Sequence, residues 1–185
     1  MQGANMNEYS FFDIQIFPEE EMALPVMLRE CFKALHGLEP VQAKQVAIAF
    51  PLTKKTSLGN IIRLFAIEKN GLQQMKDQVE VLPLFRDYTR IGRMQSIALA
   101  DVEAWQAFSR FRIPTKKSDR NNSLLHDRRK QEAMHLPYIY VESSSTDSTF
   151  MLRIKVTEST AAPNSFLVNS YGLGSCAHPC WLPKV

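Results

Sequence analysis

One histidine of the sequence stands where it could take part in acid–base chemistry. His36 precedes Gly37 at the end of a helix expected over residues 19–36. An unperturbed imidazole titrates near pH ~6.5, so such a ring can accept or donate a proton at cellular pH. The C-terminal end of a helix carries partial negative charge, which favours a protonated ring that could face a phosphodiester. The same side chain could simply cap the helix, and the residues alone leave both interpretations open.

Other groupings of reactive side chains are weaker. Cys176, His178 and Cys180 lie close together in the chain, but zinc needs four well-directed ligands and no second pair follows at the usual spacing. His126 and His135 would lie on roughly opposite faces of a helix. The sequence therefore predicts no metal ion and no other cofactor, and the Cys176–Cys180 segment is expected to form a turn with free thiols.

A basic segment follows the middle of the chain. Residues 110–130 hold eight Lys and Arg against two Asp, a net charge of +6, whereas the whole chain carries +3. Such a segment fits a footprint for a polyanion, and it also fits a solvated helix face or a loop.

The elements that must position these groups begin with a βαββαβ pattern. Strands are expected over residues 9–17, 44–50, 59–67 and 79–85, and helices over residues 19–36 and 70–77. Three glutamates, Glu19, Glu20 and Glu21, would lie in the first turn of the first helix. The sequence therefore predicts an α+β protein with an N-terminal ferredoxin-like domain over residues 6–97, a fold that by itself settles no function.

A smaller C-terminal domain is expected over residues 98–185. Residues 88–96 look extended, and helices are expected over residues 101–112 and 124–135. Strands are expected over residues 138–141, 149–156 and 166–170. This domain would combine a basic helical segment with antiparallel strands.

Composition narrows the class of protein. Hydrophobic residues make up 45% of the chain and charged residues 22%, and no apolar run approaches the ~20 residues that span a bilayer. The N-terminus lacks the basic start and apolar core of a secretory signal, so we expect a cytoplasmic location and reduced thiols.

Four stretches are informative when they are taken together: KALHGL with VAIAFP, YTRIGRMQS, YIYVESSSTDSTFMLRI and the terminal SYGL. In this order and at this spacing they resemble the CRISPR repeat-processing endoribonuclease of subtype I-F systems, over nearly all of the chain from about Tyr9 onward. The resemblance implies metal-independent cleavage of CRISPR precursor RNA just below a repeat hairpin. A 2′-hydroxyl would attack the phosphate and leave a cyclic phosphate and a 5′-hydroxyl, a route closed to DNA.

The resemblance also implies roles for single residues. His36 would be the general base, Tyr171 would orient its imidazole, and Ser143 would hold the attacking nucleotide with Ser145 as a neighbouring contact. Ser144 is interpreted as part of a hairpin turn.

Further residues would contact the hairpin. The resemblance implies that Arg93 and Gln95 read base edges in the lower stem, since residues two apart on a strand point to the same side and can pair with guanine and adenine. Phe150 would stack on the terminal base pair, although a core position is its alternative.

The basic segment departs from the arginine-rich helix of better-known relatives, because Pro114 interrupts it and lysines dilute the arginines. Phosphate contacts are expected either from the later HDRRK helix or from the following residues: Arg110, Arg112, Lys116, Lys117 and Arg120.

The resemblance thus implies a monomeric endoribonuclease that stays bound to its mature guide RNA as a subunit of a CRISPR surveillance complex, in a defence or a transposon setting. One alternative is a hairpin-binding subunit that does not cleave, although His36, Tyr171 and Ser143 are all present. The other is a ferredoxin-like interaction module that binds any polyanion without hairpin preference.

Overall fold

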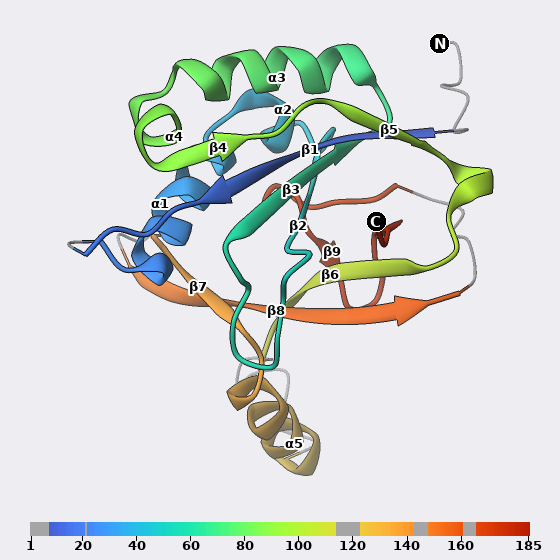
Figure 1. Ribbon diagram of the computed structural model, residues 1–185. Helices are drawn as coiled ribbons and strands as arrows, with labels where there is room; N and C mark the ends of the chain where they lie inside the picture. Colours follow the sequence, from blue (N-terminus) through green and yellow to red (C-terminus); the bar gives the residue numbers. More distant parts are fainter. Residues whose placement is uncertain (1–7, 21, 114–122, 143–147, 161–165) are drawn as a thin grey trace.

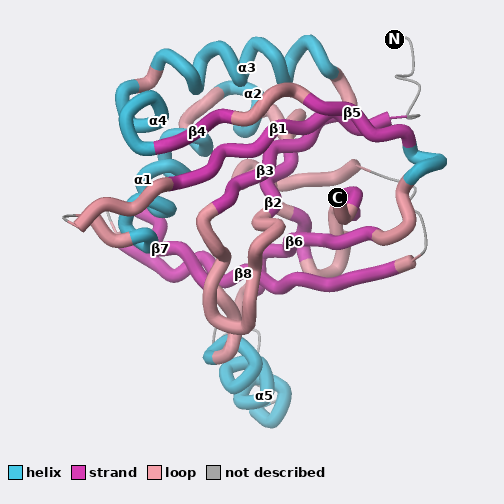
Figure 2. Tube along the Cα trace, in the orientation of Figure 1, coloured by secondary structure: helices cyan, strands magenta, loops and turns pink. Residues whose placement is uncertain are grey.

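Two sheets form the frame of the protein in the computed structural model, which describes residues 8–20, 22–113, 123–142, 148–160 and 166–185. One sheet lies above the other in Figure 1; α3 covers the upper sheet and α5 projects below the lower one. Figure 2 shows the same layers coloured by secondary structure.

The first sheet has the strand order β2-β3-β1, and both β4 and β5 pair with the free side of β1. Every pairing within it is antiparallel. Its strands are β1 (Glu8–Ile16), β2 (Ala47–Ala49), β3 (Ile61–Ala66), β4 (Thr89–Ile91) and β5 (Gln95–Ala98). Its helices are α1 (Leu24–His36), α2 (Glu39–Gln42), α3 (Lys69–Val81) and α4 (Pro83–Tyr88). This order confirms the predicted α+β class and the ferredoxin-like arrangement.

Alternation along β1 explains how this sheet is covered on both faces. Phe12 and Ile14 are fully buried on the side that meets α3, whose Leu72, Met75 and Val79 recur at helical spacing and are also fully buried. On the opposite side of β1, the ring of Tyr9 meets that of Trp105 from the second sheet, with the centroids 6.2 Å apart.

The second sheet has the order β10-β6-β8-β7, and β9 pairs in parallel with β6. Its strands are β6 (Trp105–Phe111), β7 (Tyr138–Glu142), β8 (Thr149–Ser159), β9 (Gly174–Ser175) and β10 (Trp181–Pro183). The short 3-10 helix η1 (Leu99–Asp101) precedes it, and α5 (Ser123–Met134) follows β6 in the chain. Side chains from both sheets belong to one hydrophobic cluster, while the division into domains at residue 97 stays a prediction.

One predicted strand is wrong. Residues 79–85 are not extended, because α3 runs to Val81 and α4 begins at Pro83. Val79 continues the buried series of Leu72 and Met75, so helical spacing outweighs the β-branched character of this stretch. The fourth strand of the fold comes instead from residues 88–96, which were expected to be extended and form β4 and the start of β5.

Two C-terminal predictions are also wrong. The expected helix over residues 101–112 is replaced by η1 and strand β6, which is buried on both faces and therefore shows no alternation of polarity. Residues 166–170 form no strand and enter a turn. The helix over residues 124–135 and the strands at 138–141 and 149–156 are confirmed as α5, β7 and β8.

The first helix begins later than expected. It starts at Leu24 with Pro25 in its first turn, so Glu19 and Glu20 lie outside it and no acidic residue occupies that turn. No helix in the described part of the chain is long and apolar enough to cross a membrane.

Candidate active site

His36 is the last residue of α1, and the helix holds it at the boundary of the core. The buried side of α1 includes Cys31, Phe32 and Leu35, which fixes the rotation of the helix about its axis. His36 itself is half-buried. Gly37 follows with its N–H bonded to the carbonyls of Lys33 and Ala34, and it adopts a right-handed φ of −71°. The helix therefore ends without the left-handed glycine that often terminates helices.

Tyr171 lies in a tight turn whose shape is fixed by hydrogen bonds to Asn169 and by the conformation of Gly172. The side-chain Oδ1 of Asn169 accepts hydrogen bonds from the N–H groups of Tyr171 at 2.8 Å and Leu173 at 3.4 Å. Gly172 has a φ of +69°, and its carbonyl accepts a hydrogen bond of 2.7 Å from Ile48 N–H in β2. A Cβ added at Gly172 would lie 2.7 Å from Ile48 Cγ1, so only glycine fits.

This turn brings Tyr171 against α1. The ring centroids of His36 and Tyr171 are 4.4 Å apart, with an interplanar angle of 58°. Tyr171 also contacts Phe32, one helical turn before His36, with the ring centroids 6.4 Å apart and the rings nearly parallel at 8°. The phenol thus packs against both a core aromatic ring and the imidazole of α1, and it limits the orientations that the imidazole can take.

Arg110 of β6 completes the cluster. Its guanidinium carbon lies 5.0 Å from the ring centroid of Tyr171 and 5.3 Å from that of Phe150 in β8. Burial and the positive charge of Arg112 lower the pKa of Arg110, while a hydrogen bond to Tyr171 opposes that shift. The sequence predicted Arg110 only as a phosphate contact on a helix; its place over Tyr171 was missed, because residue 110 was assigned to a helix rather than to a strand.

An ion pair connects α1 to β7 beside the cluster. Lys33 Nζ lies 2.5 Å from Glu142 Oε2, and both side chains are largely exposed. The hydrogen bond from Lys33 lowers the pKa of Glu142, and the same bond raises the pKa of Lys33. Ser143 follows Glu142 in the chain, but Ser143 and Ser145 lie outside the described residues, as do Lys116, Lys117 and Arg120.

The geometry can now be set beside known proteins. The sequence profile described as CRISPR-associated protein (Cas_Csy4) matches residues 11–181. The chain belongs to the Cas_Csy4 family. At the level of the family, it is an endoribonuclease that processes CRISPR RNA, and it binds CRISPR repeat RNA.

Solved structures similar to this Cas_Csy4 chain include a CRISPR RNA processing endoribonuclease, Cas6b, at 8% identity and a TM-score of 0.39, covering 95% of this chain and 100% of that one. A mutant chlorite dismutase from Candidatus Nitrospira defluvii in complex with cyanide matches at 11% identity and a TM-score of 0.35, covering 83% of this chain and 76% of that one. Both scores are below 0.5, so the family assignment rests on the sequence match. A search of curated proteins found no match.

Two predicted RNA-reading residues of the Cas_Csy4 chain lie away from this cluster. Arg93 is in the exposed connection between β4 and β5, and Gln95 opens β5 opposite Phe11. β5 lies at one edge of the first sheet, whereas the turn of Tyr171 bonds to β2 at the other edge. Three strand spacings, about 14 Å, separate these edges.

Basic residues with the same two-residue spacing lie nearer to Tyr171. Arg110 and Arg112 line a cavity of about 370 Å³ together with Arg129 of α5, Asn169 and Cys176. Two parts of the basic segment were expected as alternative sources of phosphate contacts, namely its start and the HDRRK helix. Arg110 and Arg112 belong to the first and Arg129 to the second, and all three line the same cavity.

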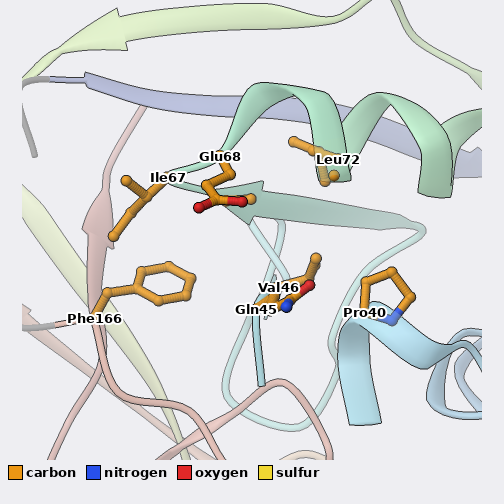
Figure 3. A pocket seen from close by; sticks show the side chains of 9 residues that line it. Pro40, Gln45, Val46, Ile67, Glu68, Leu72 and Phe166 are labelled. Carbon is orange, nitrogen blue, oxygen red and sulfur yellow. The ribbon is translucent and has the colours of Figure 1, made fainter. Parts of the chain in front are cut away.

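A separate cavity of about 210 Å³ lies between α2, the end of β3 and the start of α3. Figure 3 shows the ring of Phe166 and the carboxylate of Glu68 directed into it. Glu68 is the one charged residue of its described lining, so this cavity would repel a phosphate. It forms no part of the His36 cluster.

The cysteines are free thiols. Burial raises the pKa of Cys31 and of Cys180 to about 12. Cys176 is exposed, and its Sγ lies 3.6 Å from the Arg110 carbonyl oxygen. Among the described residues, no group of three or more His, Cys, Asp or Glu lies close enough together to hold a metal ion.

Proposed function

We propose that this Cas_Csy4 protein cleaves CRISPR precursor RNA at the base of the repeat hairpin without a metal ion, as in subtype I-F systems. The observation that carries the proposal is the contact between His36 and Tyr171, whose rings meet at 4.4 Å beside Arg110. A base, a group that restricts it and a cation converge from α1, the 169–172 turn and β6. A histidine that only caps the helix would need neither Tyr171 nor Arg110 beside it.

The chemistry follows from the roles of these groups. The imidazole of His36 takes the proton of the 2′-hydroxyl, and the resulting oxygen attacks the adjacent phosphorus. The bond from phosphorus to the 5′-oxygen breaks, that oxygen takes up a proton, and a 2′,3′-cyclic phosphate and a 5′-hydroxyl remain. Arg110, whose guanidinium lies over the ring of Tyr171, supplies the positive charge that stabilises the extra negative charge of the pentacoordinate phosphate, and its position beside Tyr171 supports this role.

The remaining roles are proposed for residues around this centre. Ser143 holds the attacking nucleotide, with Ser145 beside it, and Phe150 stacks on the terminal base pair while Arg110 lies over its ring. Arg93 and Gln95 read a part of the stem farther from the cut. Basic side chains bind the stem phosphates, namely Arg112 and Arg129 in the cavity and Lys116, Lys117 and Arg120 in the following segment.

We further propose that the protein is monomeric and retains the cleaved hairpin as a subunit of a surveillance complex. Tight product binding is compatible with an enzyme whose affinity comes mainly from stem contacts rather than from the broken bond.

The test uses the repeat RNA of the protein's own locus in EDTA, beside a copy with one 2′-deoxy substitution just upstream of the expected cut. Cleavage of the unmodified RNA alone is the expected result. Cleavage of both RNAs would exclude attack by the 2′-hydroxyl. Tight binding of both without cleavage would leave a hairpin-holding subunit and make His36 a helix cap.

A further inference from the structure

The outward face of β7 and β8 carries large side chains that the core does not use. Tyr138, Tyr140 and Met151 are 43%, 45% and 44% exposed, whereas their neighbours Ile139 and Leu152 are buried on the inward face. The strand register sets Tyr140 opposite Met151, so the three side chains form one continuous patch. A sheet face that is exposed to solvent normally carries polar residues, so three large exposed side chains in one place are unusual.

The two tyrosines are held in a fixed arrangement. Their ring centroids are 5.2 Å apart at an interplanar angle of 83°, which is an edge-to-face arrangement. Arg153 lies opposite Tyr138 in β8, with its guanidinium carbon 5.7 Å from the Tyr138 ring centroid. The same guanidinium donates a hydrogen bond to the carbonyl of Ala133 in α5, which anchors it.

The patch lies on the opposite face of β8 from Phe150, and it approaches the candidate active site at the end of β6. Met151 and Arg153 line a cavity of about 390 Å³ together with Arg110 and Arg112, and Arg110 lies over both Tyr171 and Phe150. On its other side, Tyr140 adjoins Lys33, which precedes His36 by one helical turn. A strand of RNA that leaves the hairpin base and passes around the end of β6 would meet these arginines and then the exposed aromatic rings.

Aromatic rings interleaved with arginines on a sheet surface bind unpaired bases by stacking, while the arginines bind the phosphates between them. The charge of the surroundings favours such an anion, because Arg110, Arg112 and Arg153 border the patch and the carboxylate of Glu142, two residues after Tyr140, is paired with Lys33. We propose that Tyr138, Tyr140 and Met151 form a stacking platform for the single-stranded RNA that flanks the repeat hairpin. This inference rests on the proposed function, and it adds a second binding site to it.

The test measures the affinity of the whole protein for four RNAs, and each RNA that spans the expected cut carries a 2′-deoxy block there. They are the hairpin alone, the hairpin with a 5′ flank, the hairpin with a 3′ flank, and a single-stranded oligouridine. The variant is Tyr138→Ala with Tyr140→Ala. Tyr138→Phe with Tyr140→Phe keeps the rings, and Phe17→Ala removes an aromatic side chain that is 46% exposed elsewhere.

The alanine variant should lose about tenfold in affinity for one flanked hairpin, and that RNA identifies which flank is bound. It should bind the bare hairpin as the wild type does, and the phenylalanine variant and Phe17→Ala should behave as the wild type throughout. Equal affinity of the alanine variant and the wild type for both flanked RNAs would overturn the platform, as would an equal loss on the bare hairpin.

The oligouridine separates this inference from the function on which it rests. Suppose that the wild type binds oligouridine as well as it binds the hairpin, and that the alanine variant no longer binds oligouridine. This result would support the platform and contradict the proposed hairpin specificity. If the wild type binds the hairpin and neither flank raises its affinity, the result would support the hairpin specificity and contradict the platform. Thermal unfolding of each variant confirms that the fold is intact.

Discussion

The ring of His36 touches a tyrosine that is 135 positions away in the chain, and this distant contact is what separates a base from a helix cap. A capping histidine needs only the last carbonyls of its own helix. In this protein Phe32 and Arg110 also contact Tyr171 and help to fix its ring. Because Tyr171 packs against His36, several side chains together determine where the imidazole lies. The proposed role of His36 therefore depends on residues that are far from it in the sequence, namely Tyr171 and Arg110.

Replacement of His36 by alanine should abolish cleavage and leave hairpin affinity almost unchanged. A general base stabilises the transition state far more than the bound ground state. Single-turnover cleavage and a gel-shift titration on the repeat RNA measure the two effects. His135→Ala, at an exposed histidine after α5, should change neither. Lost hairpin binding in His36→Ala would show that the residue binds RNA rather than acting as a base.

Part of this site could be predicted from the sequence. The resemblance selected Tyr171 and Phe150, which the structure brings to the same arginine. Asn169 was missed, although Asn two residues before the tyrosine and Gly after it are a known turn signal. The position of Arg110 over Tyr171 could not be derived, since it depends on how β6 and the C-terminal turn meet.

At the scale of elements, the 169–172 turn is the part that carries Tyr171 to the end of α1. It has no regular secondary structure of its own, and its shape comes from Asn169, from Gly172 and from the hydrogen bond to β2. The sequence predicted a strand there because Phe166, Leu167 and Val168 favour extended structure. The error shows that a short apolar run can lead into a turn, which in this protein brings Tyr171 against α1.

Substitution of Gly172 by alanine should impair both stability and cleavage. A left-handed φ costs an alanine roughly 1 kcal/mol, and the added Cβ would meet Ile48 at 2.7 Å, so the turn and Tyr171 must move. Thermal unfolding and single-turnover cleavage measure the two effects. Gly71→Ala is the matched control: no atom lies within 4 Å of its added Cβ, and in α3 the change should be neutral or stabilising. Wild-type cleavage by Gly172→Ala would show that the turn does not hold Tyr171.

The ion pair between α1 and β7 should depend on pH in a defined direction. Because Lys33 lowers the pKa of Glu142, the pair contributes its stabilisation above the ordinary glutamate value of ~4.3 and loses it as the pH falls through the lowered value. A carboxyl NMR titration should place the midpoint of Glu142 below ~4.3, and Lys33→Met should return it toward that value. Arg29→Met should move it less, since Arg29 is a minor cause. An unchanged midpoint in Lys33→Met would mean that the pair does not form in solution.

At the scale of the whole molecule, Arg63 joins β3 of the first sheet to the segment that follows β10 of the second sheet. Its guanidinium donates to both Asp13 oxygens, at 2.6 and 2.9 Å, and at 2.5 Å to the carbonyl of Val185. The same group lies 4.8 Å from the Phe11 ring centroid. Helical and strand periodicity predicted most of the elements around this contact, but not that the two sheets share one core, because that depends on which apolar faces meet.

Replacement of Arg63 by methionine should destabilise the protein by about 2 kcal/mol, since it leaves the half-buried Asp13 carboxylate without its partner. Urea unfolding measures the loss, and adding Asp13→Asn should restore part of it because the unpaired charge disappears. Arg86→Met is the comparison: its pair with Asp87 is exposed, so the change should be close to neutral. Equal effects of Arg63→Met and Arg86→Met would exclude a stabilising role for the buried pair.

The distance along the chain between His36 and Tyr171 also affects when the site forms during synthesis. A ribosome makes His36 early, and the first sheet can fold around it once residue 98 has emerged. Tyr171 and its glycine turn follow 135 positions later, so a nascent chain holds His36 for a time without the ring that packs against it. The cluster of His36, Tyr171 and Arg110 can therefore form only after Tyr171 has left the ribosome.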